Sequence, residues 1–90
     1  MSVNIERPIG RTSYPRCVAD VFEANILTIT CMDDDSTVAE IPADGWCSVS
    51  VSSDDSGQLL YSLTNPRGAE LREKADQQIR AYLETTHAHV

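Results

Sequence analysis

The chain has 90 residues, of which 41% are hydrophobic and 23% are charged, so we expect one globular domain with a thin core rather than a disordered segment. Its formal net charge is -7, and this acidic balance disfavours direct binding to nucleic acids and membranes. No stretch approaches the roughly 20 apolar residues of a membrane span, and no signal-like run begins the chain, so a cytoplasmic protein is expected.

The charge is distributed unevenly along the chain. Residues 1–16 carry a net charge of +2 and residues 66–90 a net charge of zero, whereas residues 17–65 carry -9 and contain no lysine or arginine. This asymmetry predicts a negative field over one part of the surface, which favours a basic partner. The alternative is that the acidic residues only keep a small protein soluble.

The positions of proline and glycine, together with the periodicity of apolar residues, divide the chain into three predicted segments. We expect residues 1–16 to form an irregular N-terminal arm, because prolines and a glycine interrupt any regular pattern there. Within this arm, Val3 and Ile5 alternate with polar residues as in a short edge strand. Residues 17–86 are expected to form a single α+β domain, and residues 87–90 a flexible tail.

A first β-hairpin is expected around a loop at residues 23–25. With a loop of this length Cys17 lies opposite Cys31, and one face of the hairpin is wholly apolar, whereas a two-residue loop would set apolar residues against polar ones. For the two facing cysteines, buried thiols are favoured over a disulfide, and a disulfide over a metal site or catalysis. The apolar face comprises Cys17, Ala19, Val21, Leu27, Ile29 and Cys31.

Residues 37–41 favour a short strand, although a single helical turn is the alternative. If they form a strand in an antiparallel meander, the acidic loops at residues 33–36 and 53–57 emerge at the same end of the sheet. Five aspartates would then share one rim. If residues 37–41 are only a connection, the two loops lie at opposite ends.

A second hairpin is expected over residues 46–65, where apolar residues alternate with serines on either side of a Ser-Asp-Asp-Ser-Gly loop. Matching the apolar faces predicts that Val51 lies opposite Leu59 and Val49 opposite Tyr61. The same register sets Cys47 opposite Leu63.

The last element is a predicted helix. Asn65 is a favourable N-cap, Pro66 suits the first helical position, and residues 67–85 contain no breaker after Gly68. An apolar stripe of Leu71, Ala75, Ile79, Tyr82 and Leu83 is expected to face the sheet. The predicted fold is therefore α+β: an antiparallel four- to five-stranded β-meander with one C-terminal amphipathic helix packed across one face.

The sequence does not favour an enzyme, a cofactor or a metal site. The three cysteines have no zinc-site spacing, and both histidines lie in the predicted tail, where nothing would hold an imidazole beside a thiol. The triplet Asp33, Asp34 and Asp35 invites comparison with a calcium loop, but Thr37 and Val38 stand where that loop needs an oxygen ligand and a glycine.

The sequence predicts a small, acidic, non-enzymatic protein-binding module. We expect it to act as an inhibitor or adaptor on a basic, nucleic-acid-binding site of a larger protein or complex, by analogy of size and charge with phage-encoded anti-CRISPR proteins. The alternative is a structural subunit that dimerises through an apolar sheet face or edge, since Trp46 and Phe22 are assigned to outward faces with Val18, Ile26 and Leu60. The candidate partner-binding residues are Asp33, Asp34, Asp35, Asp54, Asp55, Glu40, Asp44 and Trp46.

Overall fold

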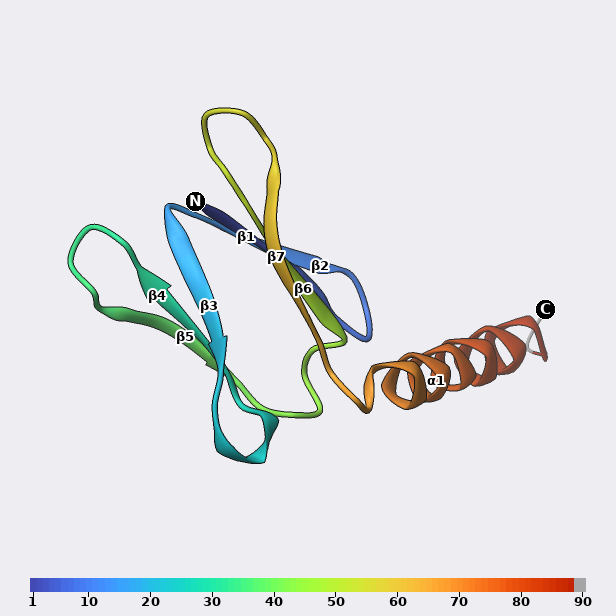
Figure 1. The fold of residues 1–90 in the computed structure, drawn as a ribbon. Coiled ribbons are helices and arrows are strands. Elements are labelled where there is room, and N and C mark those ends of the chain that lie inside the picture. Colours follow the sequence, from blue (N-terminus) through green and yellow to red (C-terminus); the bar gives the residue numbers. More distant parts are fainter. Residues whose placement is uncertain (89–90) are drawn as a thin grey trace.

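The protein consists of two antiparallel β-sheets and one C-terminal helix (Figure 1), seen in a computed structural model that describes residues 1–88. The predicted α+β class is confirmed, although the strands form two sheets rather than one meander. The elements are β1 (Ser2–Glu6), β2 (Arg11–Pro15), β3 (Cys17–Val21), the 3-10 turn η1 (Glu23–Asn25), β4 (Leu27–Cys31), β5 (Thr37–Ile41), β6 (Ser48–Ser52), β7 (Leu59–Thr64) and α1 (Gly68–Ala88).

The three-stranded sheet has the order β3-β4-β5, and its first hairpin has the predicted register. Cys17 pairs with Cys31, and the connection between the two strands is the three-residue turn η1. Ala24 and Asn25 take positive φ angles of 60° and 56°, which tightens this turn. The prediction that residues 37–41 form a strand is also confirmed, because β5 pairs with β4.

The four-stranded sheet has the order β2-β1-β6-β7, and it corrects the prediction of an irregular N-terminal arm. Residues 1–16 supply two of its strands, and β1 lies in the interior of the sheet, between β2 and β6. Val3 pairs with Val51 of β6, far along the chain. The pairing that makes β1 a strand is therefore with a distant segment and not with its sequence neighbours alone. A turn with Gly10 at φ 80° returns the chain into β2.

The second hairpin is present, but its predicted register was wrong by two residues. Val51 pairs with Tyr61 and Val49 with Leu63, and the register shifts between Val51 and Ser52. The loop is one residue longer than expected: the predicted register sets Ser53 opposite Gly57, whereas the Ser53 amide donates to the Gln58 carbonyl at 2.9 Å. A shift by two residues keeps Val49, Val51 and Tyr61 on their predicted face. Leu59 lies beyond the bulge and is 57% exposed, so its predicted inward placement was wrong.

The core lies between the two sheets, which cover each other's apolar faces. This packing corrects the outward placement of Trp46, whose side chain is only 1% exposed and whose Nε1 donates to the Asn25 carbonyl at 2.9 Å. A further link joins the sheets, since the Tyr61 hydroxyl donates to the Ala19 carbonyl at 3.0 Å and accepts from the Ala19 amide at 3.2 Å. The buried core comprises Val3, Ile5, Cys17, Ala19, Leu27, Ile29, Ile41, Trp46, Val49 and Val51.

The predicted capping by Asn65 is confirmed, because its side chain accepts from the Arg67 amide at 3.0 Å. The helix itself begins at Gly68, after a turn at residues 66 and 67. Its expected packing across a sheet was wrong. Leu71 and Ala75 are buried, but the rest of the apolar stripe is exposed, and Figure 1 shows α1 extending away from both sheets. The reason is that the second sheet already covers the apolar face that the helix was expected to cover. The helix includes residues 87 and 88 of the predicted tail, and residues 89–90 lie outside the described residues.

Candidate functional site

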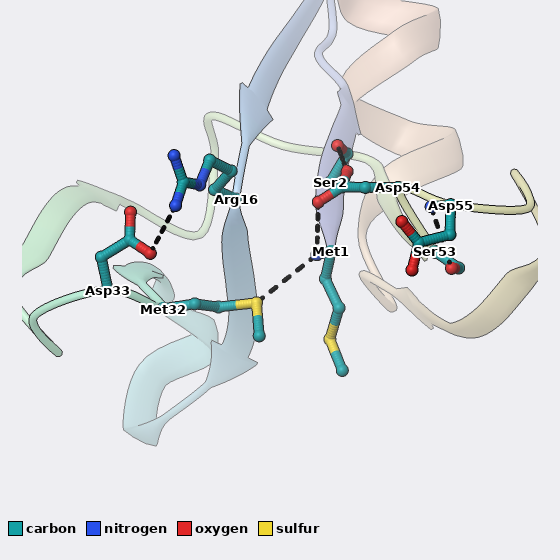
Figure 2. A network of polar contacts seen from close by, with 8 residues as sticks. All are labelled: Met1, Ser2, Arg16, Met32, Asp33, Ser53, Asp54 and Asp55. Carbon is teal, nitrogen blue, oxygen red and sulfur yellow. Dashed lines mark hydrogen bonds and ion pairs between the residues drawn. The ribbon is translucent and has the colours of Figure 1, made fainter.

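The two acidic loops lie at the same end of the molecule, although they belong to different sheets. The N-terminal ammonium of Met1 joins them: it lies 2.6 Å from Asp54 Oδ2 and 3.5 Å from the sulfur of Met32 (Figure 2). Ser2 also donates a hydrogen bond to Asp54. We call the aspartates of these loops the loop rim: Asp33, Asp34, Asp35, Asp54 and Asp55.

Two cationic groups neutralise part of the loop rim. Asp54 pairs with the Met1 ammonium, and Asp33 Oδ1 lies 2.9 Å from Arg16 Nη2 (Figure 2). Within residues 1–88, no ion pair engages the other three aspartates, all of which are exposed. The loop rim therefore keeps a negative excess, but a smaller one than five free carboxylates would give.

Hydrogen bonds hold two of these carboxylates in their charged form. The side chain and backbone of Ser36 donate to Asp34, at 2.7 and 3.0 Å, and lower the pKa of Asp34 below its ordinary value. The N-terminal ammonium, followed by Ser2, lowers the pKa of Asp54 in the same way. Both groups thus remain ionised in mildly acidic solution.

The outward side of the three-stranded sheet forms a second acidic surface. Thr28 on the middle strand pairs with Asp20 on one side and with Glu40 on the other, so the two carboxylates lie in one row across the sheet. Residues 17–41, which form this sheet, contain six acidic residues and no lysine or arginine. We call the outward residues of these strands the acidic sheet face: Val18, Asp20, Thr28, Thr30, Val38 and Glu40.

An open groove lies beside the acidic sheet face, next to the η1 turn. It is lined by Phe22, Glu23, Ile26, Thr28 and Glu40. The Phe22 side chain is 61% exposed, which confirms its outward placement. Sequence reasoning singled out the exposed aromatic and the acid separately, but their proximity depends on the pairing of β4 with β5. The groove combines two carboxylates with an aromatic side chain, a residue type that is enriched at protein-binding surfaces.

Three of the candidate partner-binding residues lie away from the loop rim. Glu40 belongs to the acidic sheet face, and Asp44 lies beside the helix, where it lines an open groove with Arg67 and Lys74. Trp46 is buried in the core, so the expectation that its side chain contacts a partner is wrong. The structure therefore brings the five loop aspartates to one end, as expected, and places Glu40 and Asp44 elsewhere.

Metal binding, membrane insertion and thiol chemistry are three further properties of residues 1–88. In that part of the chain no group of three or more His, Cys, Asp or Glu residues could hold a metal ion, and no helix is long and apolar enough to cross a bilayer. All three cysteines are free thiols. Burial, followed by the charges of Cys31 and Asp33, raises the pKa of Cys17, which keeps this thiol protonated and unreactive.

Comparison of the chain with protein-family models, with curated protein sequences and with solved structures found no match. The surfaces described above are therefore the basis for assigning a function. Two of them, the loop rim and the acidic sheet face, combine exposure with a negative charge, and the acidic sheet face also has an aromatic side chain beside it.

Proposed function

We propose that this protein is a non-enzymatic protein-binding module that occupies a basic, nucleic-acid-binding site on a larger protein or complex. The observation that carries the proposal is the acidic sheet face, where Asp20 and Glu40 lie in one row on an open sheet. The strands of this sheet and their connections, residues 17–41, contain four further carboxylates and no lysine or arginine. A surface of one sign attracts a partner surface of the opposite sign and accelerates their encounter.

Phe22 supplies an exposed apolar contact, which a charged surface alone lacks. Exposed charges contribute little to affinity after solvent screening, whereas an aromatic side chain that enters a pocket of the partner is a common source of binding energy. Phe22 stands beside Glu23 and Glu40 in one groove, so an apolar contact and two charge contacts are available to the same partner. The loop rim extends the negative surface at another edge of the molecule.

A partner site that binds phosphates suits these carboxylates. Strands are about 4.8 Å apart, so Asp20 and Glu40 on the two outer strands are separated by roughly 10 Å, a spacing at which two arginine or lysine side chains can each bind one carboxylate. The proposal includes inhibitors of nucleic-acid enzymes, of which phage-encoded anti-CRISPR proteins are examples, and a cytoplasmic location, where such enzymes work.

The proposal is tested by binding to a panel of purified nucleic-acid-binding enzymes, beginning with CRISPR effector complexes assembled with guide RNA. Binding is measured with and without target DNA as a competitor. We expect DNA to compete, and affinity to fall steeply as salt is raised. The triple variant Asp20→Asn/Phe22→Ala/Glu40→Gln should bind at least tenfold more weakly, roughly the loss of 1.4 kcal/mol or more.

The matched control removes the same number of negative charges from the helix, through Glu73→Gln and Glu84→Gln. Both residues lie on α1, away from the acidic sheet face. The control should keep wild-type affinity within about twofold, since only net charge has changed. An equal loss in the two variants, or binding that DNA does not reduce, would contradict the proposal.

A further inference from the structure

Cys17 and Cys31 lie directly opposite each other on the neighbouring strands β3 and β4. The adjacent pair along the two strands is hydrogen-bonded, since the Met32 amide donates to the Arg16 carbonyl at 3.0 Å. Hydrogen-bonded and non-hydrogen-bonded pairs alternate in an antiparallel ladder. The two cysteines therefore form a non-hydrogen-bonded pair, which is the kind in which the side chains lie closer together.

The backbone groups of the two cysteines point away from each other, as this kind of pair requires. The Cys17 amide donates to the Met1 carbonyl at 2.9 Å. The Cys31 amide donates to the Ser36 carbonyl at 2.8 Å. In a non-hydrogen-bonded pair the Cα atoms are about 4.5 Å apart, which lies within the range of roughly 4.4 to 6.8 Å that disulfides span. A bond between the two sulfur atoms is therefore compatible with the backbone of this hairpin.

The two thiols point to the same side of the sheet but differ in exposure. Cys17 is 4% exposed and belongs to the core, whereas Cys31, at the end of β4, is only half-buried. Thiol–disulfide exchange begins at a thiol that the reagent can reach. Burial also raises the pKa of Cys17, which disfavours its thiolate. Cys31 is therefore the thiol that meets a reagent first, with Cys17 held opposite it.

We propose that Cys17 and Cys31 form a reversible disulfide by exchange with a low-molecular-weight disulfide such as oxidised glutathione. The Cys31 thiolate attacks the reagent, whose S–S bond breaks, and one small thiol leaves. Cys17 then attacks the Cys31 sulfur of this mixed disulfide, and the second small thiol leaves. The two protein sulfurs are oxidised, the two reagent sulfurs are reduced, and the protons of the protein thiols end on the released molecules. The position of Cys17 opposite Cys31 favours the second step, because the reaction is intramolecular.

The cysteine pair lies beside the loop rim, so its oxidation alters that surface. An ion pair between Arg16 and Asp33 joins the chain just before β3 to the chain just after β4 (Figure 2). Ser36 is the main cause of the lowered pKa of Asp34, and the Cys31 thiol donates a further hydrogen bond to the same carboxylate. A disulfide has no thiol proton to donate. Oxidation of Cys31 therefore removes one hydrogen bond from the loop rim.

The inference is independent of the proposed partner and is tested on the folded full chain in glutathione buffers of increasing oxidised fraction. An alkylating reagent traps the free thiols, and mass spectrometry counts them. The oxidised chain should lose the mass of two hydrogen atoms and keep one alkylated cysteine, Cys47, and dithiothreitol should restore all three thiols. Trypsin cannot separate the cysteines, because residues 17–65 contain no lysine or arginine, so digestion at acidic residues identifies the bonded pair.

Cys47 provides the matched control, because its amide donates to the Glu6 carbonyl, at the opposite end of β1 from the Met1 carbonyl that binds Cys17. Cys47→Ala should form the disulfide as the wild type does, and Cys31→Ala should form none, with circular dichroism checking that both are folded. Mapping of the wild-type chain decides the matter even if a variant unfolds. Three results would overturn the inference: three thiols retained in oxidised glutathione alone, a mixed disulfide on Cys31 that does not close, or a disulfide that includes Cys47.

Discussion

The two sheets of this protein differ in how they are assembled and in what they carry. The three-stranded sheet is built from consecutive residues 17–41, which contain no basic residue and six acidic ones, two on the strands and four in the connections between them. The four-stranded sheet joins residues 2–15 to residues 48–64 and contains both signs of charge. The three-stranded sheet is thus formed by strands that are adjacent in sequence, and all its charged residues are acidic. The four-stranded sheet is formed by segments far apart in sequence, and it covers the apolar side of the first sheet.

In this arrangement, the residues that stabilise the fold and the residues that carry the surface charge lie on opposite sides of the three-stranded sheet. The inward side of the three-stranded sheet supplies Cys17, Ala19, Leu27, Ile29 and Ile41 to the core, while its outward side carries the charge. Because the four-stranded sheet covers only the inward side, the acidic sheet face stays open. Changes at the contact between the sheets should therefore affect unfolding, and changes on the open face should affect binding.

The largest effect is expected for Trp46→Ala, which removes the largest side chain between the sheets. The cavity and the lost hydrogen bond to Asn25 should lower the free energy of unfolding by about 3 to 5 kcal/mol. Phe22→Ala is the matched aromatic control on the open side, and it should cost less than about 0.5 kcal/mol. Urea unfolding measures both. Similar losses would show that the core is not where the two sheets meet.

A smaller effect is expected for Gly68→Ala, at the point where the helix leaves the four-stranded sheet. A Cβ at this position would lie 2.9 Å from the backbone carbonyl oxygen of Cys47, so the first turn of the helix must shift. We expect a loss of about 1 to 3 kcal/mol in urea unfolding, despite the better helix propensity of alanine. Ala69→Ser, at the exposed next position, should be neutral, and a stabilised Gly68→Ala protein would contradict the close packing.

Tyr61→Phe tests the polar link between the sheets. The substitution leaves the amide and carbonyl of Ala19 without the hydroxyl that binds both, and the free energy of unfolding should fall by about 1 kcal/mol. Tyr14→Phe is the control, because the Tyr14 hydroxyl makes no hydrogen bond to any residue in the described range 1–88. If both variants unfold at the same urea concentration, the link between Tyr61 and Ala19 does not stabilise the fold.

The smallest effect is expected where the two acidic loops meet. The fold lowers the pKa of Asp54, so this group stabilises the protein above its ordinary pKa and loses that contribution as the pH falls through its value in the fold. Asp54→Asn should therefore lower the Tm at pH 7 and flatten the decrease in Tm between about pH 5 and pH 2. Asp55→Asn is the control on the same loop. A wild-type slope in Asp54→Asn would show that the Met1 contact contributes no pH dependence.

Features that depend on neighbouring residues were predicted most accurately. The β3–β4 register followed from matching apolar faces across a three-residue turn, and the start of the helix followed from Asn65 and Pro66. The β6–β7 register was wrong by two residues because a longer loop and a bulge are not evident from alternation alone. The candidate site was predicted in part: the acidic loops share one end, but the groove of Phe22 and Glu40 depends on strand pairing.

By itself, the sequence determined the two hairpins and the helix, the apolar face of each hairpin and the segment that carries the acidic excess, because these follow from side-chain period, turn residues and charge. Only the tertiary structure decided what covers those faces. Val3 and Ile5 show too short an alternation to identify their partners, and β1 became a central strand because β6 offers it a hydrogen-bonding edge and a matching apolar face. With the second sheet in that place, Trp46 was buried and the helix stripe was left exposed.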